Sequence, residues 1–205
     1  MNAPIAGQRG MRDIRAIAIG GSAGGVEALA ELLPALTARG MLSIFVVVHQ
    51  PRDRSSLLPG IFASRCAFAV CEPDDKQVVR PDHIYFAPAD YHMLVDAGPR
   101  ISLSADDLVH HSRPSIDVLF ESAADVYAEH LLAIVLSGGN EDGADGALAV
   151  RRAGGFVVVQ DPETARVPMM PRSALAKVAA DAVLPVAEIF ALLNELCEKE
   201  IVDDR

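Results

Sequence analysis

Three polar residues that could perform nucleophilic catalysis each come directly after, or a few residues beyond, an apolar run of the sequence. Ser22 follows the first run, His49 ends the second, and Asp142 lies in a glycine-rich loop after a third. A hydroxyl, an imidazole and a carboxylate serve as nucleophile, general base and orienting acid in such chemistry. In an open parallel sheet, functional groups gather beyond the carboxyl ends of the strands. We therefore expect these three loops to form one site.

The segment around Ser22 has the pattern G-x-S-x-G, formed by Gly20, Ser22 and Gly24. Its glycines allow a sharp strand-to-helix turn that presents the serine hydroxyl, and the backbone N–H of Ala23 would face a developing oxyanion. Two alternatives stay open. The segment could be a plain tight turn in which Ser22 caps the following helix. It could also bind a dinucleotide, although Ser22 then occupies the place of the middle glycine.

His49 competes with five other histidines for the role of base. They are His83, His92, His110, His111 and His130. A histidine in an apolar context is more often a packing residue than a catalyst. The position of His49 at the end of a buried strand favours it. His110 and His111 are expected in a polar loop, and His83 and His92 are expected to be exposed beside a hairpin.

Spacing alone does not identify the acid of the site. Glu141 and Asp145 lie in the same loop as Asp142. The loop could also be a solvated acidic surface, because carboxylates are mostly exposed. All three acids are therefore candidates at this point.

Cysteine and histidine spacing gives no recognisable metal site. Cys66, Cys71 and Cys197 form no Cys-x-x-Cys pair, so we expect reduced cysteines that mostly pack. A zinc site made of Cys66, Cys71, His83 and His92 matches no known ligand spacing. We expect no metal and no organic cofactor.

The pattern of apolar residues predicts alternating strands and helices. Buried strands are predicted over residues 14–20, 44–48, 131–136, 156–159 and 182–184. Helices are predicted after residue 25, after Arg113-Pro114-Ser115, and over residues 144–152, 172–179 and 186–198. Short strands between residues 67 and 103 predict an antiparallel hairpin or small meander added to the main sheet. The alternation predicts an α/β fold: a doubly wound, mostly parallel sheet with helices on both faces.

Length and composition indicate one folded domain. The chain has 205 residues, 18 Lys and Arg against 28 Asp and Glu, a net charge of −10, and 51% hydrophobic residues. This composition excludes extensive disorder and argues against a general nucleic-acid binder. No apolar run is long enough for membrane insertion, and the first residues do not form a secretory signal. We expect a flexible segment over residues 1–12, one domain over 13–205, and a cytoplasmic location.

Five segments of the sequence resemble the catalytic domain of the CheB family, the bacterial chemotaxis protein-glutamate methylesterases. They are AIGGSAGGVEAL (18–29), VVVHQP (46–51), RPSIDVLF (113–120), LSGGNEDGADG (136–146) and MPRSAL (170–175). They occur in the order of the family and span most of the chain. The resemblance is therefore far more specific than a single G-x-S-x-G pattern.

The resemblance implies a catalytic triad of Ser22, His49 and Asp142. It selects Asp142 among the three acids because the family aspartate precedes a glycine, here Gly143. It also implies that Ala23, Gly139 and Arg113 contribute to the oxyanion region or to substrate contact. The chain order Ser, His, Asp differs from that of ordinary α/β-hydrolases, so the fold is expected to be a different one.

The resemblance further implies hydrolysis of glutamate γ-methyl esters on methyl-accepting chemoreceptors, with deamidation of glutamines as a side activity. Two residues depart from the family: Ala23 stands where a threonine is usual, and Gly139 where a methionine is common. Family members commonly carry an N-terminal receiver domain, whereas only about a dozen residues precede the first predicted strand here. Two interpretations stay open: the receiver domain has been removed from this sequence, or the chain is a stand-alone esterase without that switch. A separate receiver protein is an expected partner.

Two other classes of function compete with the esterase. A nucleotide- or phosphate-binding module would hold an anion at Gly21, Ser22 and Gly25, at the start of the following helix. A catalytically silent receptor-binding protein would keep the fold without the chemistry.

Overall fold

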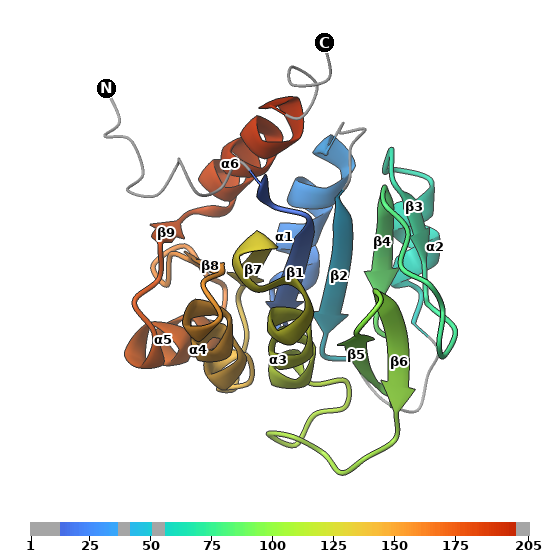
Figure 1. The fold of residues 1–205 in the computed structure, drawn as a ribbon. Coiled ribbons are helices and arrows are strands. Elements are labelled where there is room, and N and C mark those ends of the chain that lie inside the picture. Colours follow the sequence, from blue (N-terminus) through green and yellow to red (C-terminus); the bar gives the residue numbers. More distant parts are fainter. Residues whose placement is uncertain (1–12, 37–41, 51–55, 200–205) are drawn as a thin grey trace.

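The computed structural model describes residues 13–36, 42–50 and 56–199. The segment 1–12, for which the sequence predicts flexibility, lies outside the described residues. Within them, the chain forms a twisted sheet flanked by helices on its two faces (Figure 1).

Seven parallel strands form the main sheet, in the order β3-β4-β2-β1-β7-β8-β9. Their bounds are β1 Ala16–Gly21, β2 Ser43–Val48, β3 Ala69–Cys71, β4 His83–Phe86, β7 Leu131–Val135, β8 Phe156–Gln160 and β9 Ala182–Leu184. Every neighbouring pair in this order is parallel. The predicted α/β class with a mostly parallel sheet is confirmed.

The short strands between residues 67 and 103 divide between two sheets. β5 (His92–Asp96) and β6 (Arg100–Ser104) form the antiparallel hairpin that the sequence predicts, as a separate two-stranded sheet. β3 and β4 instead pair in parallel at one edge of the main sheet. The reason is burial: Ile84, Tyr85 and Phe86 of β4 are almost completely inaccessible, which suits a strand covered on both faces.

Two hydrophobic cores lie on opposite faces of the main sheet. The bounds of the helices are α1 Gly25–Leu32, α2 Leu58–Ala63, α3 Ile116–Tyr127, α4 Ala144–Arg152, α5 Met169–Lys177 and α6 Val186–Lys199, with 3-10 turns Leu33–Ala35 and Ala128–His130. One core contains residues of α1, α2 and α6, and the other contains residues of α3, α4, α5 and the β5–β6 hairpin. Figure 1 shows the second group on the near face of the sheet. The sequence did not predict α2.

Small residues on β1 let helix α3 approach the sheet closely. Ala16 and Ala18 of β1 pack in the same core as Ile116 of α3. At Gly20 a side chain would collide with Ile116. The first turn of α3 therefore lies directly beside the carboxyl end of β1, and this close approach requires a glycine at position 20.

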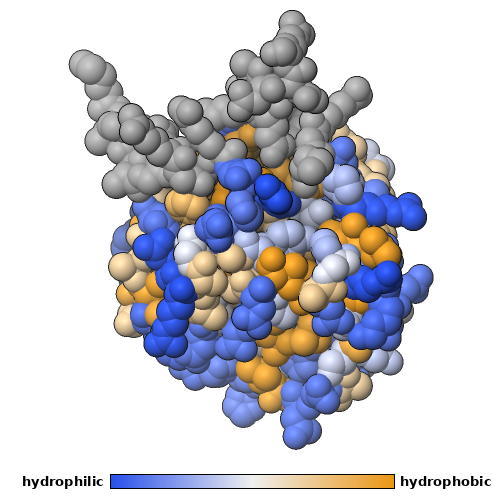
Figure 2. Space-filling model, viewed as in Figure 1, coloured by the Kyte–Doolittle hydropathy of each residue, from blue (hydrophilic) through white to orange (hydrophobic). Residues whose placement is uncertain are grey.

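The near face of the molecule is mixed in polarity. Hydrophilic residues surround several separate apolar patches in the space-filling view (Figure 2). In the described ranges, no helix combines the length and the apolar character that crossing a membrane requires.

Candidate active site

The register of β1 and β2 brings Ser22 and His49 to the same edge of the sheet. Gly21 of β1 lies opposite Val48 of β2. The backbone N–H of His49 donates to the carbonyl oxygen of Gly21 at 3.2 Å. Neighbouring strands lie roughly 4.8 Å apart. Ser22 and His49 therefore leave the sheet side by side, although 26 residues separate them in the sequence.

Backbone contacts to the loop after β7 hold the Ser22 turn. The N–H of Ser22 donates to the carbonyl oxygen of Ser137 at 2.9 Å, and the Ser137 hydroxyl donates to the carbonyl oxygen of Ala23 at 2.7 Å. Gly24 has a φ of 88° and occupies the N-cap position of α1, which has no side-chain cap. The capping alternative for Ser22 is therefore wrong. Among the described residues, no hydrogen bond engages the Ser22 hydroxyl, so it is available for other chemistry.

His49 and Asp142 form a direct side-chain pair across 93 residues of sequence. His49 Nε2 lies 2.8 Å from Asp142 Oδ2, and the side chains are 14% and 0% exposed. Ser115 Oγ donates to Asp142 Oδ1 at 2.8 Å. The N–H groups of Ile116 and Asp117 donate to its two oxygens at 2.8 Å and 3.0 Å. The start of α3 thus surrounds the Asp142 carboxylate with donors.

These donors keep Asp142 ionised. Burial raises the pKa of the Asp142 carboxyl, but hydrogen bonds from His49 and the α3 backbone outweigh burial and hold the pKa below its ordinary value. An ionised carboxylate only accepts hydrogen bonds, so Nε2 of His49 must carry a proton. In the neutral imidazole, Nδ1 then holds the free lone pair. Nδ1 is therefore the nitrogen that can accept a proton from a nucleophile.

Ser112 is the side chain that faces Nδ1 in this structure. Its Oγ lies 3.4 Å from His49 Nδ1 and also 3.4 Å from Nδ2 of Asn140. No hydrogen bond joins Ser22 to His49 within the part of the chain that the structure describes. Catalytic hydrogen bonds are often long or misaligned without substrate. Sequence spacing gave no signal for Ser112, because it lies outside the strand ends.

His92 belongs to the supporting network of the site and not to the surface. It is 2% exposed, its Nδ1 accepts from the N–H of Ser115 at 3.1 Å, and its Nε2 faces the carbonyl oxygen of Asp107 at 3.0 Å. The prediction that His92 is exposed is wrong. The α3 face covers the hairpin strand that carries it, which the sequence of the hairpin does not reveal.

The candidate oxyanion residues lie at the exposed edge of this region. Ala23 and Gly139 are both exposed residues. Arg113 has a different environment. Its guanidinium donates to Asp90 at 2.8 Å and 3.1 Å, and to the carbonyl oxygens of Ala105 and Asp106 at 2.6 Å and 2.8 Å. These contacts tie together the loops before β5 and before α3.

Of the three candidate acids, Asp142 is the one that contacts His49. Glu141 lies 3.3 Å from Nδ1 of His110, and Asp145 lies 2.6 Å from Nζ of Lys177. The solvated-loop alternative therefore holds for Glu141 and Asp145, which are exposed, but not for fully buried Asp142.

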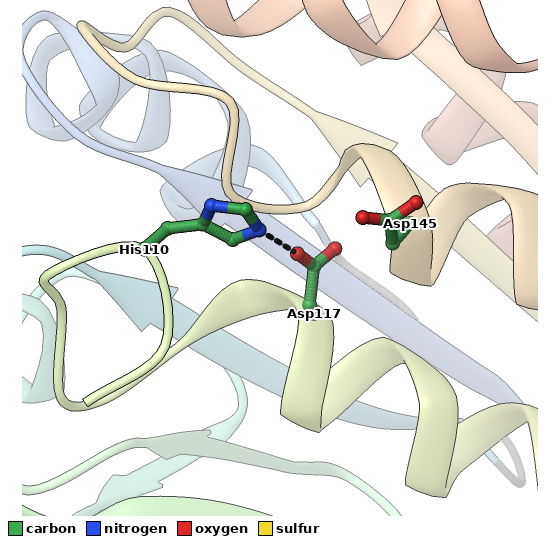
Figure 3. A group of neighbouring side chains, drawn as sticks. All are labelled: His110, Asp117 and Asp145. Atoms are coloured by element: carbon green, nitrogen blue, oxygen red, sulfur yellow. Dashed lines mark ion pairs between the residues drawn. The ribbon is translucent and has the colours of Figure 1, made fainter. Parts of the chain in front are cut away.

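One group of side chains has the donor types of a metal site. Ligand atoms of His110, Asp117 and Asp145 all lie within 4.8 Å of one another (Figure 3). His110 Nε2 is 3.3 Å from Asp117 Oδ2, and Lys177 is bound to Asp145, so both carboxylates already face basic groups. These contacts explain the cluster without an ion.

The cysteines and the histidines near them do not form such a group. No three of Cys66, Cys71, His83 and His92, all of which lie in the described ranges, come together as potential ligands. Cys66 and Cys71 are partly buried free thiols, and burial raises their pKa, so they are poor nucleophiles. The side chain of Cys197 lies outside the described residues.

A histidine paired with a fully buried carboxylate lies beyond the carboxyl ends of the central strands, and the serine hydroxyl at the end of the adjacent strand makes no hydrogen bond among the described residues. With the parallel sheet and its two helical layers, this places the chain in the class of doubly wound α/β proteins whose site lies at the strand ends.

Comparison with known proteins assigns the family. The sequence model of the CheB methylesterase family matches residues 17–193. The crystal structure of the Thermotoga maritima CheB methylesterase catalytic domain superposes with a TM-score of 0.85 at 33% identity, covering 89% of this chain and 98% of that one. The chain belongs to the CheB methylesterase family.

Relatives from several bacteria differ in length from this chain. A relative from Leptospira interrogans is 38% identical over 88% of this chain and 95% of its own length. Proteins from Symbiobacterium thermophilum and Rhodospirillum rubrum, both named protein-glutamate methylesterase/protein-glutamine glutaminase, are 39% and 38% identical over 85% and 92% of this chain. The matched region covers 48% and 53% of those two relatives.

Proposed function

We propose that this chain is a serine esterase that hydrolyses glutamate γ-methyl esters on chemoreceptor proteins, giving glutamate and methanol. The observation that carries the proposal is the 2.8 Å contact between His49 Nε2 and the buried, ionised Asp142, beside Ser22 at the end of β1. The family and the names of its relatives support the substrate class. Deamidation of receptor glutamines is proposed as a second activity of the same site.

The first half of the reaction forms an acyl-enzyme. The Ser22 hydroxyl attacks the ester carbonyl while His49 accepts its proton at Nδ1. Asp142 stabilises the imidazolium through Nε2 and holds the ring orientation. The N–H groups of Ala23 and Gly139 are proposed to donate to the oxyanion. The proton then passes from His49 to the methoxide, the carbon–oxygen bond breaks, and methanol leaves.

The second half regenerates the enzyme by the same groups. His49 takes a proton from water, the hydroxide attacks the glutamyl ester of Ser22, and the proton returns to the serine oxygen as glutamate is released. With a glutamine substrate, ammonia leaves in place of methanol. Proton transfer and charge stabilisation are sufficient for these steps.

Arg113 is proposed to contribute to substrate contact through the loops that it holds. Its hydrogen bonds to Asp90 and to Asp106 join two loops, and the second of these carries Ser112, whose Oγ lies 3.4 Å from His49 Nδ1. We propose that these loops receive the receptor segment, and that a separate receiver protein controls access to them. The proposed location for this enzyme is the cytoplasm.

Single-turnover methanol release from methylated receptor tests the proposal. Wild type is expected to release methanol and Ser22→Ala is not, because no acyl-enzyme can form. Ser64→Ala, an exposed serine after α2, is the matched control and is expected to keep the wild-type rate. Retention of that rate in Ser22→Ala would falsify the nucleophile assignment.

Two further measurements separate the esterase from its competitors. A serine-reactive phosphonate is expected to label wild type at Ser22, whereas a silent receptor-binding protein would stay unlabelled. Calorimetry with common nucleotides is expected to show no specific heat of binding. Tight nucleotide binding that the Ser22→Ala change weakens would favour the phosphate-binding module.

A further inference from the structure

The carboxylates of Asp142 and Asp117 bind the starts of each other's helices. Asp142, just before α4, accepts from the N–H groups of Ile116 and Asp117 at the start of α3. Asp117 in α3 accepts at Oδ1 from the N–H groups of Gly143 and Gly146 at the start of α4, at 2.9 Å and 2.6 Å. Helix N-termini favour negative charge, so each carboxylate stabilises the opposite helix.

These reciprocal hydrogen bonds hold the chain at two consecutive residues, Asp142 and Gly143. The backbone N–H of Asp117 binds the side chain of Asp142, while the side chain of Asp117 binds the backbone N–H of Gly143. Gly143 has a φ of 95°, so the chain turns sharply there. With the side chain held on one side of this turn and the next peptide on the other, the Asp142 carboxylate has little freedom to leave Nε2 of His49.

The other oxygen of Asp117 has no such bond. Oδ2 is buried, makes no hydrogen bond within the described residues, and lies 3.3 Å from His110 Nε2 (Figure 3). Asp117 is 3% exposed and does not reach the solvent side of the site. It therefore cannot contact a substrate, and any effect on the reaction must pass through other residues.

We propose that Asp117 is a positioning residue of this esterase, which holds the Asp142–Gly143 turn so that the Asp142 carboxylate stays aligned with His49. The expected effect of Asp117 on catalysis rests on the proposed function. Its effect on the position of Asp142 rests on the two sets of backbone hydrogen bonds. Sequence spacing does not reveal this role, because it depends on two helices that are adjacent only in the folded chain.

The charge of Asp117 adds to this role. The pKa of the Asp117 carboxyl is raised to about 6, chiefly by burial and also by the Asp142 charge, while the hydrogen bond from Gly146 and the neighbouring His110 oppose this rise. The other ionisable groups around it are His110 and Glu141 in the neighbouring loops, Asp145 on α4, Lys177 on α5 and Glu121 on α3. When ionised, Asp117 is a second negative charge behind Asp142 and favours a protonated His49.

Asp117→Ala and Asp117→Asn test the positioning role, with Asp145→Asn as the matched control. Asp145 is an acid of the same helix start that binds Lys177 and none of the α4 N–H groups. We expect Asp117→Ala to lower kcat by about 10- to 100-fold and to change KM by less than about twofold. Asp117→Asn is expected to restore most of kcat, because its amide oxygen can accept from Gly143 and Gly146.

The pH profile of kcat distinguishes positioning from mere structural support. In Asp117→Asn the midpoint is expected to move to lower pH, because one negative charge that favours the imidazolium is gone. Asp145→Asn is expected to keep the wild-type kcat. If Asp117→Ala does not fold, the pH midpoint of kcat in Asp117→Asn is the deciding measurement. A midpoint equal to that of wild type overturns the proposal.

Proton NMR without substrate provides a readout that is independent of the esterase activity. The proton on His49 Nε2 is expected as a downfield resonance that His49→Gln removes. Asp117→Ala should shift or broaden it, while Asp145→Asn should leave it unchanged. A folded Asp117→Ala protein with the wild-type resonance overturns the proposal, as does a rise in KM alone. If wild type lacks esterase activity but the resonance responds as expected, the proposed function fails and the positioning of Asp142 stands.

Discussion

His49 Nε2 lies 2.8 Å from Asp142 Oδ2, which leaves Nδ1 as the nitrogen that can act as base. In the serine protease template, the roles of the two nitrogens are reversed: Nδ1 binds the aspartate and Nε2 receives the proton. His49 follows the end of β2, and its partner Asp142 is held by the N–H groups of Ile116 and Asp117 at the start of α3. In the proposed mechanism, Nδ1 is therefore the atom that takes the proton of Ser22.

Activity is expected to rise with pH, because the proposed mechanism requires a neutral imidazole. The rate is expected to increase from acidic pH toward neutral pH as the imidazole loses its proton. Initial rates of methanol release between pH 5 and pH 9 check this. A profile that is flat across this interval argues against a histidine base.

Ser115→Ala is expected to lower both stability and kcat. The Ser115 hydroxyl donates to Asp142 Oδ1 at 2.8 Å and accepts from the N–H of Val118 as the cap of α3. Loss of a cap and of a bond to a buried carboxylate costs about 1–2 kcal/mol in the free energy of unfolding. Urea unfolding and single-turnover rates give the two quantities.

Ser122→Ala is the control for Ser115→Ala on the same helix. Its hydroxyl accepts from Val95 of the hairpin at 3.1 Å and donates to the carbonyl oxygen of Val118 at 2.8 Å, away from Asp142. We expect this variant to lose stability but keep kcat. Equal losses of kcat in the two variants would show that Ser115 acts only through the stability of α3.

Gly24→Ala is expected to disturb the Ser22 turn. Gly24 has a φ of 88°, and a Cβ there would lie 2.7 Å from Ser137 Oγ and 2.8 Å from Arg166 Cβ. Strain of this kind costs about 1–3 kcal/mol in the free energy of unfolding, and relief by movement of the turn would displace Ser22. Thermal unfolding and phosphonate labelling at Ser22 measure both effects.

Gly139→Ala is the matched glycine control for Gly24→Ala. A Cβ at Gly139 would have Val167 Cγ1 as its nearest neighbour, at 3.8 Å, which is ordinary contact. We expect its stability to stay within about 0.5 kcal/mol of wild type. Its activity is expected to persist, because only its backbone N–H is assigned a role. A large loss of activity here would indicate that substrate requires the space beside Gly139.

The stability of Asp117→Asn relative to wild type is expected to rise with pH. The folded-state pKa of Asp117 is about 6, above the roughly 3.9 of an unfolded aspartate. Between these values folded wild type binds more protons than the unfolded chain, so its stability falls as pH increases. Asp117→Asn has no carboxyl at this position and does not lose stability in this way. The free energy of unfolding of the variant minus that of wild type should therefore grow by about 1–3 kcal/mol from pH 4 to pH 7. Urea unfolding at several pH values checks it, and a difference that does not vary with pH would contradict the raised pKa.

The order of the elements could be predicted from local sequence patterns. The helix over residues 144–152 and the strand over 182–184 have the predicted bounds, and the other predicted strands differ by one or two residues. The helix predicted from residue 172 begins at Met169 instead. Apolar periodicity and glycine turns depend only on residues close together in the chain, so they can be recognised from the sequence alone.

The candidate site could be predicted only in part. Ser22, His49 and Asp142 are predicted as site residues because they come after buried strands and because the five segments resemble one family. The contact between His49 and Asp142 joins residues 93 positions apart, and it exists because β1 lies between β2 and β7 in the sheet. That order is a tertiary property, since parallel strands pair through crossovers that no local pattern specifies.

The support of the site was decided by tertiary structure alone. The sequence predicts that His92, beside a hairpin, is exposed. In the structure it is buried and accepts a hydrogen bond from Ser115 at the start of α3. In the sequence, Asp117 is an acidic residue in the first turn of a predicted helix. In the structure its carboxylate accepts from the N–H groups of Gly143 and Gly146 at the start of α4. The sequence determines which elements form and which residues end them, because these depend on short-range periodicity. Packing between helices decides which buried polar groups become partners, because each must find its hydrogen bonds among residues distant in the chain.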